Sequence, residues 1–254
     1  MNDNASSSAA RYREALATLK ERGGPLTPGT FVSLPFSEYP RPLSRAWQYQ
    51  IARLRAYVTE ISSLLMFKLS SMPSWTQRPR WRAQRASIVP TATALHRTSL
   101  EAYAAGDSET LRRICLGNHA GTLIAALDRR PSREGVRFTF EPRRSIWYPR
   151  LVSHLIYRLD AEQASEQAIV AISSRQRVER YVVGTGMGVP GSLRLQEKVE
   201  YVVLSRLVDM KSWVGKPWRI WGTVAPTSLE DYYRDKIATE KDMMSRAGWN
   251  KSSS

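Results

Sequence analysis

The stretch Val136-Arg137-Phe138-Thr139-Phe140-Glu141 decides the fold class of this sequence. Its apolar and polar residues alternate, which is the period of a strand with one buried face. The segments before it have the spacing of helices, and those after it, to about Val224, have the spacing of strands with no helix between them. Helices followed by consecutive strands predict an α+β fold with a meandering antiparallel sheet.

The helices and strands around this stretch follow from local signals. Asp107 and Asn118 are candidate helix caps, and Gly106 ends the helix before them. Helices are therefore expected over 9–22, 91–105, 107–116 and 118–130, and strands over about 151–159, 170–178, 198–210 and 217–224. The glycine-rich segment 184–191 predicts a hairpin loop, since a strand and no phosphate-binding helix follows it. Thr227-Ser228-Leu229-Glu230 is a capping box that opens a last helix.

The charge of the chain predicts a polyanionic partner. It has 254 residues, with 38 Lys and Arg against 23 Asp and Glu, a formal net charge of +15. Most of the basic residues are Arg, whose guanidinium group forms forked hydrogen bonds with phosphate and stacks on flat rings. RNA and an anionic membrane surface are the two partners that this composition favours.

The chain divides into four parts by composition. Residues 71–100 contain no acid and three prolines, so much of this stretch is expected to be a linker. The division is an irregular basic N-terminal extension over 1–45, an amphipathic helix with an Arg/Trp-rich linker over 46–87, an α+β domain over 88–235, and a C-terminal helix and tail over 236–254. The core from Ile88 onward is expected to fold without the linker.

The strongest helical pattern runs over 46–70. Its large apolar residues form one continuous stripe, made of Trp47, Ile51, Leu54, Val58, Ile61, Leu65 and Leu69. Charged residues such as Arg53 and Glu60 argue against a membrane-spanning role. The stripe is expected to pack on its own domain, as such stripes usually do, or to face a membrane surface or a partner protein.

The segment 75–85 is the main candidate for RNA binding. It combines two tryptophans and four arginines without an acid: Trp75, Arg78, Arg80, Trp81, Arg82 and Arg85. Guanidinium groups can contact phosphates while indole rings stack on unpaired bases. With few aliphatic residues, the segment is expected either to become ordered on RNA or to remain a linker. A second patch contains Arg143, Arg144 and Trp147, and a third contains Arg129, Arg130 and Arg133. For both, solvated loop charges are the alternative.

The sequence predicts no catalytic residues, no metal site and no cofactor. His96, His119 and His154 are far apart, and no acidic residue stands near them at metal-binding helical spacing. The single cysteine, Cys115, excludes an internal disulfide and a cysteine-rich zinc site. His154, in a predicted strand, could face the interior and is expected to be structural.

The ending Trp218-Arg219-Ile220-Trp221-Gly222-Thr223-Val224, followed by Pro226-Thr227-Ser228 and an acidic helix start, resembles the TIM-forty-four-like domain family. The likeness covers about 91–233. It implies a curved, cone-shaped sheet wrapped around a helix, as in cystatin-like and nuclear-transport-factor-two-like folds. It also implies a mitochondrial matrix location, associated with the inner membrane through the ribosome.

Within this family, the Arg-rich extension favours the branch of mitochondrial large-subunit ribosomal protein forty-five, related to the fungal inner-membrane ribosome receptor. The resemblance implies a structural protein that binds rRNA near the polypeptide exit tunnel and helps align it with the inner membrane. The partners would be large-subunit rRNA, neighbouring ribosomal proteins, and the inner-membrane surface or an insertase, with no small-molecule substrate. The alternatives are a peripheral inner-membrane adaptor or import-motor tether, and an enzyme that uses the cavity of the cone.

Overall fold

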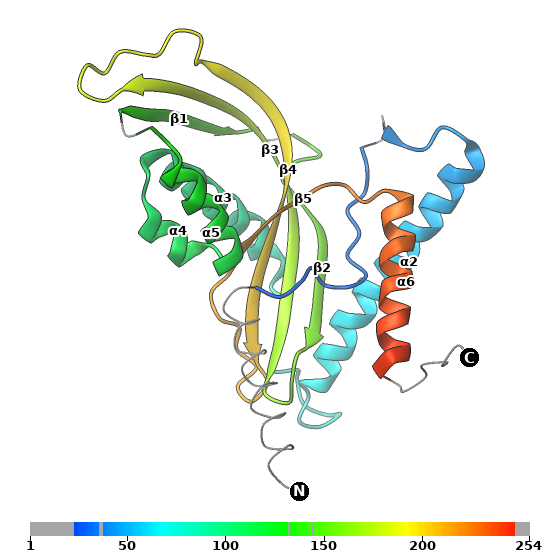
Figure 1. The fold of residues 1–254 in the computed structure, drawn as a ribbon. Helices are drawn as coiled ribbons and strands as arrows, with labels where there is room; N and C mark the ends of the chain where they lie inside the picture. The colour runs from blue at the N-terminus through cyan, green and yellow to red at the C-terminus, as the bar shows by residue number, and fades with distance from the viewer. Residues whose placement is uncertain (1–22, 36–37, 132, 144, 247–254) are drawn as a thin grey trace, which may run out of the picture.

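A computed structural model describes residues 23–35, 38–131, 133–143 and 145–246 of the chain (Figure 1). Its elements are α2 (Leu43–Ser70), α3 (Arg85–Ala105), α4 (Ser108–Ile114), α5 (Gly117–Asp128), β1 (Glu134–Pro142), β2 (Arg150–Arg158), β3 (Gln163–Val182), β4 (Arg194–Asp209), β5 (Arg219–Val224) and α6 (Leu229–Arg246). The predicted α+β class is confirmed, with an antiparallel five-stranded sheet. The helix expected over 9–22 and Arg144 lie outside the described residues.

The sheet is organised around β3, a strand of 20 residues. One edge of β3 pairs with β4, which pairs in turn with β5. Along the other edge, β2 pairs with residues 164–171 and β1 with residues 174–182. Strands β2 to β5 therefore form the expected antiparallel meander. The prediction is wrong for β1, which lies end to end with β2 along β3 and does not pair with it. A strand about 65 Å long has room for two nine-residue partners on one edge.

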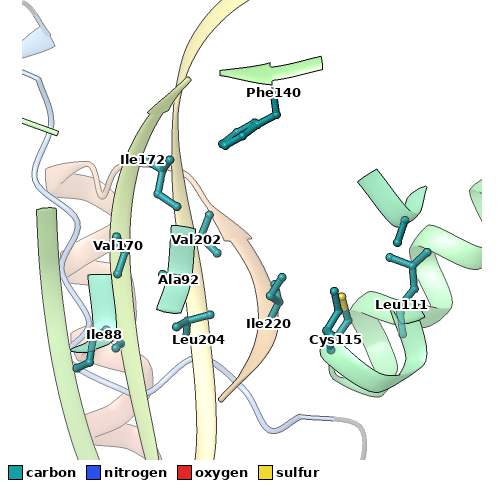
Figure 2. Close-up of a cluster of buried hydrophobic side chains, with 14 residues drawn as sticks. Ile88, Ala92, Leu111, Cys115, Phe140, Val170, Ile172, Val202, Leu204 and Ile220 are labelled. Atoms are coloured by element: carbon teal, nitrogen blue, oxygen red, sulfur yellow. The ribbon is translucent and has the colours of Figure 1, made fainter. Parts of the chain in front are cut away.

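The two faces of the sheet carry different layers. Helices α3, α4 and α5 lie against the concave face, beneath the curve of β3 and β4, and α2 and α6 lie on the other side (Figure 1). Alternate residues of the central strands point to the concave side, and Val170, Val202 and Leu204 pack there around Ile88 and Ala92 of α3 (Figure 2). This cluster is the main core of the molecule.

The segment 24–34 is part of the same packing unit. The side-chain oxygen Oε1 of Gln167 on β3 accepts hydrogen bonds from the amide and the hydroxyl of Thr27, at 2.9 and 2.7 Å. The indole of Trp221 donates to the carbonyl of Gly24. Val32 is buried against the second face of the sheet. The predicted separation of residues 1–45 from the domain therefore does not describe the packing of residues 24–34.

The segment 71–84 carries the chain from α2 on one face to α3 on the other. Trp81 is 2% exposed and packs with Phe67 and Met210 in a second cluster at the end of the sheet. Its ring meets that of Phe67 edge-on, with ring centroids 5.0 Å apart. The expected boundary at 87/88 falls inside α3, which begins at Arg85. The core beyond Ile88 is closed by a tryptophan from the predicted linker.

The helix ends follow the predicted capping chemistry in part. Asp107 caps α4 by accepting a hydrogen bond from the Thr110 amide, as expected. The cap position of α5 is Leu116 instead of Asn118. At α6, the hydroxyl of Ser228 accepts from the Asp231 amide, one position later than the expected box. Helix α3 begins at Arg85 instead of 91 and contains Pro90. The flanking core residues Ile88 and Ala92 are buried, so packing offsets the backbone hydrogen bond that proline cannot make.

Replacing Trp81 by alanine tests the role of the crossing segment. We expect Trp81→Ala to lower the free energy of unfolding by about 3–5 kcal/mol, because it removes a buried aromatic ring and leaves a cavity. Denaturant unfolding followed by far-ultraviolet circular dichroism measures this loss. The matched control is Trp75→Ala, six residues earlier and 90% exposed, which should change stability by less than about 0.5 kcal/mol. Equal midpoints for the two variants would contradict the packing of Trp81.

Candidate functional site

Helix α2 packs on the domain through a face other than the apolar stripe that the sequence pattern indicated. Its buried residues are Tyr49, Ala52, Ala56, Glu60 and Phe67. The two alanines allow the helix to lie close to its neighbours. The expected packing of the apolar stripe on its own domain is therefore wrong for most of its members. The stripe residues Trp47, Leu54, Val58, Ile61, Leu65 and Leu69 are exposed, and Ile51 is partly buried.

The outer face of α2 combines exposed apolar groups with positive charge. Trp47, Leu54 and Val58 are 68%, 61% and 58% exposed. Arg53, Arg55 and Lys68 are exposed as well. The one acid of the helix, Glu60, is buried. A contiguous exposed apolar surface of this kind marks a contact with a protein or a membrane. Within the described residues, no helix has the length and apolar character needed to cross a bilayer.

Glu60 holds α2 and α3 together. Its carboxylate accepts a hydrogen bond from the Arg85 guanidinium at 3.0 Å. Burial raises the pKa of Glu60, although the charge of Arg85 opposes this effect. Arg85, predicted as a phosphate ligand, is thus the partner of a buried acid. It is therefore not counted among the arginines that can contact RNA phosphates.

The other predicted RNA-binding residues of 75–85 separate into two groups. Arg78, Arg80 and Arg82 are exposed, as is Trp75, and the segment contains no acid. None of these three arginines forms an ion pair with another described residue. Trp81 is in the core and its ring cannot stack on a base, which corrects the prediction for that residue. The structure therefore leaves one tryptophan and three arginines on the surface of this crossing segment.

The second predicted patch lies in the connection from β1 to β2. Arg143 donates to Glu197 of β4 at 2.6 Å, so part of its charge is compensated. Trp147 is 63% exposed and its neighbour Ile146 is also exposed. Arg129 and Arg133 of the third patch are exposed, but Arg130 turns inward. The Arg130 guanidinium donates to the carbonyls of Tyr103 and Ala104 and lies over the Tyr103 ring.

A buried cluster of ionisable side chains spans the neighbouring strands β2, β3 and β4 beneath α3. His154 and Glu166 are both fully buried, with Nε2 of the imidazole 2.8 Å from the Glu166 carboxylate. Arg206 donates to the other oxygen of Glu166 at 2.7 Å, and its guanidinium lies over the Trp218 ring. Buried charges persist when each one has a partner. Glu166 lies inside β3, before the strand start expected near residue 170, and its charge is satisfied there by His154 and Arg206.

A second acid, Glu200, is held by three donors on the concave face. Its carboxylate contacts Nε2 of His96 at 3.0 Å, the Gln176 amide at 2.7 Å and the Lys198 ammonium at 2.8 Å. Burial by itself would raise the pKa of Glu200, but the bonds from His96 and Lys198 outweigh it and lower the pKa to about 2. The described residues contain no cluster of three or more His, Cys, Asp or Glu that could hold a metal ion.

No protein-family model matches the chain, and no curated protein matches it either. The resemblance to the TIM-forty-four-like family rests on the sequence features of residues 91–233. The candidate functional surfaces are therefore the outer face of α2, the crossing segment 71–84 and the loop that carries Trp147.

The carboxyl group of Glu200 makes stability depend on pH. Its pKa of about 2 lies below the ordinary 4.5, so its ionised form stabilises the fold above pH 4.5 and this contribution is lost as the pH falls toward 2. We expect Glu200→Gln to cost on the order of 3 kcal/mol at pH 6, and less as the pH falls through this window. Unfolding titrations of both proteins across the pH range measure the difference. Glu197→Gln, on the same strand but exposed, is the control, and a constant cost for Glu200→Gln would contradict the prediction.

Proposed function

We propose that the protein is a structural component of the mitochondrial large ribosomal subunit, which binds rRNA near the polypeptide exit tunnel and helps align it with the inner membrane. One observation carries the proposal: α2 turns its acid-free apolar stripe outward, and the acid-free segment with Trp75, Arg78, Arg80 and Arg82 follows at its end. A polyanion-binding surface and an apolar surface thus adjoin in the sequence.

The RNA contact rests on the arginines of the crossing segment. Trp81 anchors this segment in the core, so the segment does not have to be ordered by its ligand. Arg78, Arg80 and Arg82 are then presented from a fixed backbone, which lowers the entropic cost of binding. Trp75 offers an exposed indole for stacking on a base or a sugar. Neighbouring ribosomal proteins could cover the parts of the stripe that no lipid reaches.

The membrane contact rests on the stripe of α2. An interfacial helix buries an apolar face in the lipid headgroup region, with cations and tryptophans at its border. The outer face of α2 has this composition, with Arg53, Arg55 and Lys68 around the stripe. The same observation favours the alternative function, a peripheral inner-membrane adaptor or import-motor tether, in which the stripe would meet lipid or an insertase without a ribosome.

The fold is consistent with this proposal. A curved sheet with helices in its concavity is what a cystatin-like or nuclear-transport-factor-two-like cone requires. A structural role is further supported by His96 and His154, each of which is buried and bonded to a glutamate. The matrix location follows from the same family resemblance.

Charge reversal on the crossing segment tests the RNA contact. We expect Arg78→Glu, Arg80→Glu and Arg82→Glu together to weaken binding to purified mitochondrial large subunits. The log–log salt dependence should become shallower by about 2 to 3, because three phosphate contacts are lost. Co-sedimentation over a range of salt concentrations measures both effects. The charge-matched control reverses Arg97, Arg112 and Arg113, which are exposed on α3 and α4 and belong to none of the predicted RNA-binding patches. Equal binding of the two triple variants would contradict the RNA contact.

Two acidic substitutions on the stripe test the membrane contact. Val58→Asp with Leu65→Asp should leave the fold intact, since both side chains are exposed. Association with vesicles that contain anionic phospholipid should weaken by more than about tenfold, because two apolar contacts are lost and two repelled charges are gained. Vesicle flotation measures this, and Thr59→Asp with Ser62→Asp, on the same exposed helix, is the control. If the variant floats like the wild-type protein, the stripe faces a protein instead of lipid.

A further inference from the structure

A cleft lies on the concave side of the molecule, between α3 and the far halves of β1, β3 and β4. Its volume is about 580 Å³, within the range of small-ligand sites. Fourteen residues line it: Leu100, Tyr103, Ala104, Arg130, Val136, Phe138, Gln176, Val178, Arg180, Gly191, Ser192, Arg194, Gln196 and Lys198. In Figure 1 the curve of β3 and β4 carries these strand halves past α3. None of the residues selected from the sequence as RNA-binding lies here except Arg130 of the third patch.

The walls of the cleft combine an apolar floor with positive charge. Val136, Phe138 and Val178 come from the inward-facing positions of β1 and β3 and form the floor together with Leu100 of α3. Four cationic side chains line the cleft, and none of the described Asp and Glu residues does. Such a lining suits a ligand that is both anionic and partly flat and apolar.

The four cations differ in how far they are already committed. Arg130 is held by the carbonyls at the end of α3, and Lys198 pairs with Glu200 at 2.8 Å. Arg180 reaches Glu134 at 3.2 Å with half of its side chain exposed. Arg194 forms no ion pair with any other described residue. Because Arg194 lies opposite Val178 in the register, it is the diagonal neighbour of Arg180, and the two guanidinium groups flank the apolar floor.

We infer that this cleft binds one unstacked nucleotide of single-stranded RNA. The base lies on the floor formed by Phe138 and Val178, and Arg180 and Arg194 contact the adjoining phosphates. The inference rests on the proposed function for the identity of the polyanion and adds a site and a strand type to it. Single-stranded loops are the part of RNA whose bases can be received in this way, since a duplex buries them.

The polar groups of the cleft favour a nucleotide over other anionic ligands. Gln196 places an exposed amide beside the floor, where an acyl chain would cover it without offering a hydrogen bond. The Ser192 hydroxyl is already bonded to the backbone of Arg180. A peptide of Asp and Glu residues would use the cations but has no flat ring for the apolar floor. A base uses both, through its ring faces and its polar edge.

Binding of a short single-stranded RNA oligonucleotide to the full chain, followed by fluorescence anisotropy, tests the inference. We expect Arg180→Gln with Arg194→Gln to weaken binding and to make the log–log salt dependence shallower by about 1.4, for two phosphate contacts. Ala104→Leu fills the cleft without changing its charge. It should weaken binding by about tenfold, as loss of a stacked base does, and leave the salt dependence unchanged. Arg112→Gln with Arg113→Gln, on α4 outside the cleft, is the charge-matched control and should bind like the wild-type protein.

The inference is overturned if the wild-type protein binds no oligonucleotide, or if the cleft variants bind it as tightly as the control variant. It is also overturned if these variants lose affinity for anionic vesicles or an acidic peptide while RNA binding is unchanged. Loss of oligonucleotide binding with intact large-subunit association supports it. The reversal of Arg78, Arg80 and Arg82 tests the proposed function on large subunits, so that either idea can fail while the other stands.

Discussion

Strand β3 is buried on both faces from residue 164 to residue 172, and this constraint shapes the rest of the molecule. A strand with two buried faces needs a layer of the chain on each side. Helices α3, α4 and α5 supply the concave layer. The segment 24–34 supplies part of the second layer, with α2 and α6 on the same side. The chain must therefore pass from one face to the other, and the segment 71–84 is that passage, fixed by Trp81.

The far half of the sheet is covered less completely, and the cleft inferred to bind a nucleotide lies there. Beyond residue 174, only Gln176 of β3 is buried and the other residues are half-buried or exposed, and the first part of β4 is exposed. Glu200 lies at the border between the fully covered and the less covered half of the sheet. Its carboxylate is satisfied by His96, Gln176 and Lys198 at the end of the packed core. Past this border, Arg180 and Arg194 line the cleft, and no acid in the described part of the chain lines it.

Helix α2 packs on the domain through one face only, so its other face can remain exposed in a stable fold. Ala52 and Ala56 let the helix approach its neighbours closely, and Tyr49 and Phe67 fill the spaces around them. The large stripe residues are then left outside, where they stabilise nothing in the free protein. An exposed stripe is a cost in solubility unless a partner covers it, so it is best understood as a contact surface.

The sequence by itself determined the fold class and most of the strands. Period-two alternation, as in Val136, Phe138 and Phe140, depends only on local side-chain direction. It could not determine the pairing of β1 and β2, because both segments have the same period and only the length of β3 decides between hairpin and end-to-end arrangement. The exposed Trp75, Arg78, Arg80 and Arg82 were found from composition, whereas the burial of Trp81 was not. The sequence does not distinguish the two tryptophans of this basic segment. Only the fold does, because the end of the sheet brings Phe67 and Met210 against Trp81.

The apolar stripe of α2 was predicted from the sequence, but the direction in which it faces was not. Helical periodicity gives the angle between apolar residues and leaves open which face meets the core. Here close approach through Ala52 and Ala56 decided it. The sequence could not predict the cleft, because Phe138, Arg180 and Arg194 are distant in sequence. They come together only through the register of β1, β3 and β4.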